Sequence, residues 1–186
     1  PRGVGDGGDC RAARRRVGTN LGGAQGGALG FFRDETSTRL PAVLDDSRDV
    51  DFADLDGDGD VDLHVSNTSA ISNQTNRIWI NMGGAQGGTQ GFFEDQTQAR
   101  WVGIASGSSS VAPSLVLAGG GFVDWSCDTA FADLDSNGHL DLVHSSYGGL
   151  SGGGVPTRLF LNDGSGTFTE FNPSGYRLTG SDIPDG

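Results

Sequence analysis

The amino-acid sequence predicts an all-β protein made of short antiparallel strands joined by tight turns. Segments such as residues 49–53 and 61–65 alternate polar and apolar side chains with period two, as half-buried strands do. Glycine accounts for 33 of 186 residues without the period of collagen, which is typical of many turns. Two short aspartate-rich segments flanked by such strands are the third observation, because their spacing is that of a cation-binding hairpin.

The first aspartate-rich segment spans residues 54–62 and reads Asp-Leu-Asp-Gly-Asp-Gly-Asp-Val-Asp. Like charges at alternate positions destabilise the chain unless a cation neutralises them. In a tightly turned loop, the side chains at positions 1, 3, 5 and 9 can converge on one point, and the carbonyl of position 7 can join them. Such an all-oxygen cage suits Ca²⁺, which takes roughly six to eight oxygen ligands.

A second segment, residues 133–141, carries oxygen-bearing side chains at the same positions and reads Asp-Leu-Asp-Ser-Asn-Gly-His-Leu-Asp. An EF-hand is the nearest alternative for this spacing, but its twelfth position should be glutamate, and here it is Val65 or His144. The flanking residues also have the period of strands rather than of helices. The sequence therefore predicts two strand–loop–strand calcium sites, of which the more acidic first loop binds more tightly.

An internal repeat organises the chain. Residues 20–27 and 30–36 match residues 81–88 and 91–97, 61 positions further on, and residues 161–168 form a looser third copy. One complete unit therefore has a strand, the acidic loop, a second strand, a polar connector, a third strand, a glycine-rich turn and a fourth strand. Four short antiparallel strands per repeat are typical of a blade of a β-propeller.

The expected domain organisation follows from this unit. Residues 1–47 form a partial blade, with only the third and fourth strands, and a linker. Residues 48–98 form a blade with the calcium loop 54–62, and residues 99–126 are an insertion between blades. Residues 127–186 form a blade with the calcium loop 133–141 and a C-terminal extension. The result is an incomplete propeller of two blades and a fragment.

The stretches 52–63 and 131–142 and the glycine-rich turn 162–168 resemble the FG-GAP/VCBS repeats, calcium-binding propeller repeats also found in integrin α-subunit heads. The resemblance implies a structural role for Ca²⁺ at two sites. Because such propellers close with about seven blades, it also implies that the chain is a piece of a longer polypeptide or is completed by neighbouring copies. The implied side-chain ligands are Asp54, Asp56, Asp58 and Asp62 in the first loop and Asp133, Asp135, Asn137 and Asp141 in the second, with Asp60 and His139 contributing their carbonyls.

The composition narrows the function classes. A net charge of −12 argues against nucleic acid and anionic membranes as partners, and no apolar run reaches the roughly 20 residues of a membrane span. His64, His139 and His144 do not form a catalytic or zinc constellation. These observations favour a binding module rather than an enzyme. The resemblance to FG-GAP/VCBS repeats implies in addition a location outside the cell or on its surface and a role in adhesion, surface display or assembly through a protein or glycan ligand.

Two alternatives remain open from the sequence. In a carbohydrate-binding or enzyme-associated propeller domain, Trp79, Trp101 or Trp125 would stack on sugars, although a core position is favoured for each. In a structural subunit of a filament or coat, open blades would pair with neighbours. Cys10 and Cys127 can form one disulfide, with the unpaired state favoured, and 67–69 and 73–75 are sequons for N-glycosylation.

Overall fold

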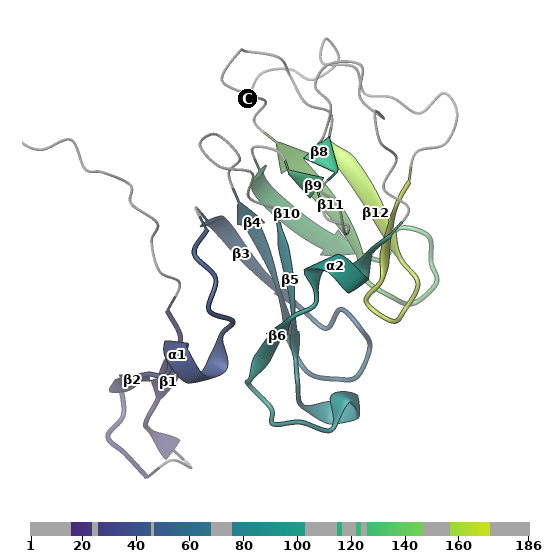
Figure 1. The fold of residues 1–186 in the computed structure, drawn as a ribbon. Coiled ribbons are helices and arrows are strands. Elements are labelled where there is room, and N and C mark those ends of the chain that lie inside the picture. The colour runs from purple at the N-terminus through teal and green to yellow at the C-terminus, as the bar shows by residue number, and fades with distance from the viewer. Residues whose placement is uncertain are drawn as a thin grey trace, which may run out of the picture.

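The computed structural model describes residues 16–23, 26–45, 47–67, 76–102, 115–116, 122–123, 126–146 and 157–171. These residues are mostly strands arranged in antiparallel sheets, with a few short helical turns (Figure 1). The expectation of a mostly β protein is confirmed.

The first of the two larger sheets has the order β3-β4-β5-β6 and is antiparallel throughout. Its strands are β3 (Ser47–Ala53), β4 (Asp62–Asn67), β5 (Arg77–Asn81) and β6 (Phe93–Asp95). These are the four strands that the sequence predicts for its complete unit, in the predicted order. The turn between β5 and β6 contains a short 3-10 helix, η2 (Gly84–Gln86).

The second larger sheet repeats this plan and gains a fifth strand. Its antiparallel strands are β10 (Ser126–Ala132), β11 (Asp141–Ser146), β12 (Arg158–Asn162) and β13 (Phe168–Glu170). Strand β7 (Trp101–Val102) pairs with β13 in parallel, so these two residues of the expected 99–126 insertion belong to a sheet. Within the same stretch, β8 (Leu115–Val116) and β9 (Phe122–Val123) pair as a hairpin, and Trp125 lies outside the described residues.

The smallest unit contains β1 (Gly18–Asn20), β2 (Phe32–Asp34) and the helical turn α1 (Thr36–Arg39). It corresponds to β5, β6 and the helical turn α2 (Thr97–Arg100). Each helical turn is fixed by one aspartate and one threonine. In the first unit the Asp34 carboxylate accepts from the N–H and hydroxyl of Thr36, whose Oγ1 accepts from Val17 N. Asp95, Thr97 and Ile78 form the same three bonds in the second unit.

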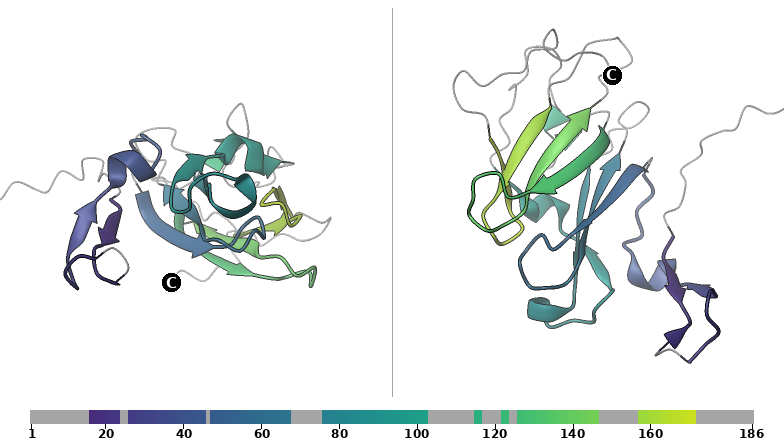
Figure 2. Two further views of the ribbon diagram at one scale, coloured as in Figure 1. Left: turned by 90° about the horizontal axis from the view of Figure 1, so that it is seen from below. Right: turned by 180° about the vertical axis from the view of Figure 1, so that it is seen from behind.

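The two larger sheets pack face to face, and the β1–β2 hairpin lies on the other side of the β3–β6 sheet (Figures 1 and 2). Between the larger sheets, Ala53, Leu55, Ile78 and Ile80 pack against Leu142, Phe160 and Phe168. Trp101 lies in this core, with its ring centroid 4.9 Å from that of Phe160 and 5.5 Å from that of Phe168. A second cluster of Leu63, Val65 and Trp79 covers the opposite face of the β3–β6 sheet.

Candidate metal-binding loops

Each acidic loop closes a β-hairpin. Loop 54–62 joins β3 to β4, and its closing pair is Ala53 opposite Asp62. Loop 133–141 joins β10 to β11, and its closing pair is Ala132 opposite Asp141. The structure therefore places both aspartate-rich segments between the first two strands of a sheet.

The last aspartate of each loop is a buried anchor. The two oxygens of Asp62 accept hydrogen bonds from Leu55 N at 2.9 Å and from Asn81 N at 2.8 Å. This carboxylate thus ties the start of its loop to the third strand of the same sheet. The equivalent bonds of the second loop run from Leu134 N and Asn162 N to Asp141, both at 2.8 Å.

The first and fifth positions shape the turn. The Asp54 carboxylate accepts from Gly57 N and Gly59 N, and that of Asp133 accepts from Asn137 N and Gly138 N. At position 5, Asp58 Oδ1 accepts from Asp60 N at 2.9 Å, and Asn137 Oδ1 accepts from His139 N at 2.8 Å. Gly59 and Gly138 have φ of 91° and 90°, which favours glycine. The two loops therefore have similar turns, which differ in whether position 4 or position 5 donates to the first carboxylate.

Among the residues that the structure describes, three groups of carboxylates could hold a metal ion. Oxygens of Asp54, Asp56 and Asp58 all lie within 4.8 Å of one another, as do oxygens of Asp133, Asp135 and Asp141. A third group, outside the loops, joins Asp49 and Asp51 of β3 to Asp128 of β10. Carboxylate oxygens are the ligands that hard cations prefer.

The first loop contains buried acceptors that have no donor. Asp60 is 5% exposed, and neither of its carboxylate oxygens has a hydrogen-bond partner among the described residues. The Oδ1 atom of Asp56 is also buried without one. A buried carboxylate without a partner is costly, and a cation supplies the missing attraction. The residues of this loop therefore fit a hard cation, and they bring the Asp60 side chain to the site as well as its carbonyl.

Burial is the largest cause of the raised pKa values in this loop. It raises the pKa of Asp62 to about 6, although bonds from Asn81 N and Leu55 N act in the opposite direction. Burial and then the Asp58 charge raise the pKa values of Asp56 and Asp60. The carboxylates are thus held close together in surroundings that disfavour their charge.

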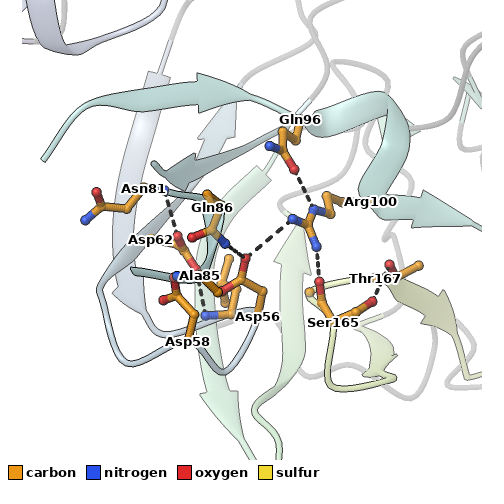
Figure 3. Close-up of polar contacts among 12 residues, drawn as sticks. Asp56, Asp58, Asp62, Asn81, Ala85, Gln86, Gln96, Arg100, Ser165 and Thr167 are labelled. Carbon is orange, nitrogen blue, oxygen red and sulfur yellow. Dashed lines mark hydrogen bonds and ion pairs between the residues drawn. The ribbon is translucent and has the colours of Figure 1, made fainter. Parts of the chain in front are cut away.

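The glycine-rich turn between β5 and β6 covers the first loop. Ala85 N donates to Asp58 Oδ2 at 3.0 Å, and Gln86 Nε2 donates to Asp56 Oδ2 at 2.5 Å (Figure 3). A Cβ atom on Gly83 would lie 2.5 Å from Asp60 Oδ2, so a larger residue there would displace the carboxylate. The turn and the loop form one packed unit.

The second loop is more open. Asp133, Asp135 and Asn137 are exposed, whereas His139 is half-buried beside the turn around Gly164. The Asn137 side-chain amide donates to Asp135 Oδ2 at 3.3 Å and to the carbonyl of Asn162 at 3.0 Å. An amide thus occupies the position that a carboxylate holds in the first loop.

The sequence analysis did not identify Gln86, Arg100, Asn81 and Asn162, which support the loops. Asn81 Oδ1 accepts from Gly83 N and Gly91 N, and Asn162 Oδ1 accepts from Gly164 N and Gly166 N. The repeat could have identified the two asparagines, because an asparagine ends the third strand of each unit, Asn20 included. The Asn20 side chain accepts from Gly22 N in the same way.

Other residues singled out in the sequence have structural positions or lie beyond the described part. Trp79 and Trp101 are buried in the two apolar clusters. His64 and His144 are also buried, with ring centroids 6.4 Å apart. Residues 1–15, with Cys10, and residues 68–75, with both sequons apart from Asn67, lie outside the described residues. Within the described residues, no helix has the length and apolar character of a membrane span.

No protein-family model matches this chain, and the search of curated proteins gives no match. The functional interpretation therefore rests on the loops, their hydrogen bonds and the repeat.

Proposed function

We propose that this chain is a calcium-binding β-propeller repeat module of the FG-GAP/VCBS kind, in which two Ca²⁺ ions have a structural role. One observation carries the proposal. Two aspartate-rich loops at equivalent places in two four-stranded arrangements have equivalent hydrogen bonds at their fifth and last positions, and in both loops the first carboxylate accepts hydrogen bonds from N–H groups of the turn. An unrelated pair of acidic turns has no reason to share this scheme.

The proposed ligands follow the loop positions. The first ion binds Asp54, Asp56, Asp58, Asp62 and Asp60, and the second binds Asp133, Asp135, Asn137, Asp141 and the carbonyl of His139. The ion neutralises carboxylates that the hairpin brings together, so its binding energy adds to the stability of the folded sheet. No step of chemical catalysis is part of this role, and we propose a binding module rather than an enzyme.

Unequal exposure of equivalent residues supports further neighbouring units. Leu55 is 1% exposed because the next sheet covers it, whereas its equivalent Leu134 is 46% exposed. Phe131 is half-buried against the β3–β6 sheet, whereas its equivalent Phe52 is 68% exposed. Apolar faces of this kind are normally covered. We therefore propose that units of a longer chain, or neighbouring copies, cover them in an extracellular or cell-surface assembly with a protein or glycan ligand.

Calcium titration tests the proposal directly. Chelator-treated protein should bind two Ca²⁺ ions in a calorimeter and melt at a higher temperature once they are bound. Mg²⁺ should bind more weakly and raise the melting temperature less, because it demands smaller, octahedral sites. Glu94→Gln, at an exposed carboxylate outside both loops, is the matched control and should bind both ions. If calcium produced no heat of binding and no shift in melting temperature, the proposal would be refuted.

A further inference from the structure

The side chain of Arg100, at the end of α2, contacts both larger sheets. Its Nη2 lies 3.5 Å from Asp56 Oδ2 in the first acidic loop, and its Nη1 donates to the carbonyl of Ser165 in the β12–β13 turn (Figure 3). A third nitrogen, Nε, donates to Gln96 Oε1 at 2.9 Å and orients the guanidinium. The guanidinium carries its donors on three nitrogens in a rigid plane, so it can reach two separated acceptors in set directions, whereas an ammonium group donates from a single nitrogen.

The two oxygens of the Asp56 carboxylate have different surroundings. Its Oδ2 accepts hydrogen bonds from Arg100 and from Gln86 Nε2, while its Oδ1 is buried and has no hydrogen-bond donor within the described part of the chain. A cation in the loop can therefore take Oδ1 without displacing Arg100 from Oδ2. Asp56 is thus the point at which the cation site and the guanidinium meet.

The β12–β13 turn fits closely against this pair. A Cβ atom on Gly166 would lie 2.9 Å from Arg100 Nη1 and 3.1 Å from Asp56 Cβ. Nearby, the Asn162 side-chain amide donates to the carbonyl of Leu55 at 2.8 Å, across the same boundary between sheets. The turn in one sheet therefore depends on the position of the loop in the other.

We propose that Arg100 is a positioning residue that couples cation binding in loop 54–62 to the order of turn 163–166 in the neighbouring sheet. The proposal rests on the proposed calcium function. Without a cation, mutual repulsion among the loop carboxylates loosens the loop, and Asp56 no longer holds the guanidinium in place. With a cation on Oδ1, Asp56 stays fixed, Arg100 stays on its Oδ2, and Ser165 keeps its donor.

The repeat supplies a matched control. Arg39 ends α1 as Arg100 ends α2, and its Nη1 donates to the carbonyl of Gly91 at 3.2 Å in the next unit. Its Nε, however, donates to Glu35 of its own unit, at 2.7 Å. Arg39 therefore makes the turn contact of Arg100 but is paired with a carboxylate outside the metal loops.

Hydrogen exchange measured by mass spectrometry tests the coupling. The background protein carries Asp133→Asn and Asp135→Asn, at exposed positions, so that the calcium response comes from loop 54–62 alone. Calcium should slow exchange in the peptide covering turn 163–166 by about fivefold or more, the lower range of allosteric couplings. Arg100→Gln and Arg100→Lys should each abolish that slowing while calorimetry still detects the ion, and Arg39→Gln should preserve it.

Three outcomes would overturn the inference. Exchange in the turn that is the same with and without bound calcium would remove the coupling and leave the proposed function standing. A full response in Arg100→Lys, which keeps the charge but not the fork of donors, would remove the bridging role. Absence of calcium binding to the background protein would overturn the proposed function and the coupling together.

Discussion

Exchanging the residue at position 5 between the two loops should weaken calcium binding at the first loop and strengthen it at the second. Position 5 is Asp58 in the first loop and Asn137 in the second, and both side chains accept the N–H of the residue two positions on. Asp58→Asn therefore gives the first loop the position-5 ligand of the second, and Asn137→Asp does the reverse, while position 7 stays Asp60 in one loop and His139 in the other. The backbone of both loops already accommodates either residue.

The expected change in calcium affinity follows from the charge at position 5. The expected change in stability follows from the other hydrogen bond that the position-5 side chain makes. A unit charge about 4 Å from a divalent ion contributes roughly 2 kcal/mol in water, or about 30-fold in affinity. Asp58→Asn should weaken the first site by about this factor and lower the calcium-loaded melting temperature by about 4–8 °C. In the reverse variant, a carboxylate replaces the amide that donates to the carbonyl of Asn162, so the calcium-free protein should lose about 1 kcal/mol.

Calorimetric titration of each variant, with the other loop inactivated, measures the two affinities separately. The natural first loop should bind more tightly than the natural second loop, and the two single variants should narrow that difference. An unchanged first-site affinity in Asp58→Asn would show that Asp58 does not face the ion. The reasoning from equivalent loop positions would then be refuted.

Three further predictions follow. Burial, more than the neighbouring charges of Asp49 and Asp128, raises the pKa of Asp51 from 3.8 to about 6. Because the folded state then holds this proton more tightly than the unfolded state, the stability of chelator-treated protein should fall as pH rises from about 4 to about 6, and thermal melts of Asp51→Asn should show a smaller fall. Arg158 and Glu170 form a buried pair with bonds of 2.9 and 2.8 Å, so Arg158→Met should cost about 3–5 kcal/mol in urea unfolding, and adding Glu170→Leu should recover most of it. Ser136 has φ of 64°, a strained value for serine, where the equivalent Gly57 has 76°. Ser136→Gly should therefore raise stability by about 1 kcal/mol in urea unfolding. An unchanged unfolding midpoint would show that Ser136 is not strained.

Local patterns were sufficient to predict the regular strands. The alternating segments ending at Asn81 and Asn162 form β5 and β12 over the predicted residues, because their side chains pack on both sheet faces. The helical turns α1 and α2 were not predicted. They depend on an aspartate that bonds a threonine two residues on, a side-chain interaction that periodicity does not register.

The acidic loops were recognisable because all their candidate ligands lie within nine consecutive residues. The residues that support the loops could not be recognised from the sequence, because they reach the loop from distant parts of the chain. Gln86 and Arg100 contact Asp56 across 30 and 44 positions, respectively. The buried Asp60 carboxylate also depends on the turn that packs over it, so the sequence alone indicated only its carbonyl.

The contacts across the unit boundary explain why the units of the repeat are not independent domains. Strand β7 follows α2 directly but pairs with β13, so the chain of one unit supplies the edge of the next sheet. Trp101 of that strand fills the core between the sheets, and Arg100 beside it holds the carbonyl of Ser165. A division of the chain after residue 98 would therefore separate the second sheet from its own edge strand. For the same reason, the proposed cation in the first loop would act on a boundary that both sheets share.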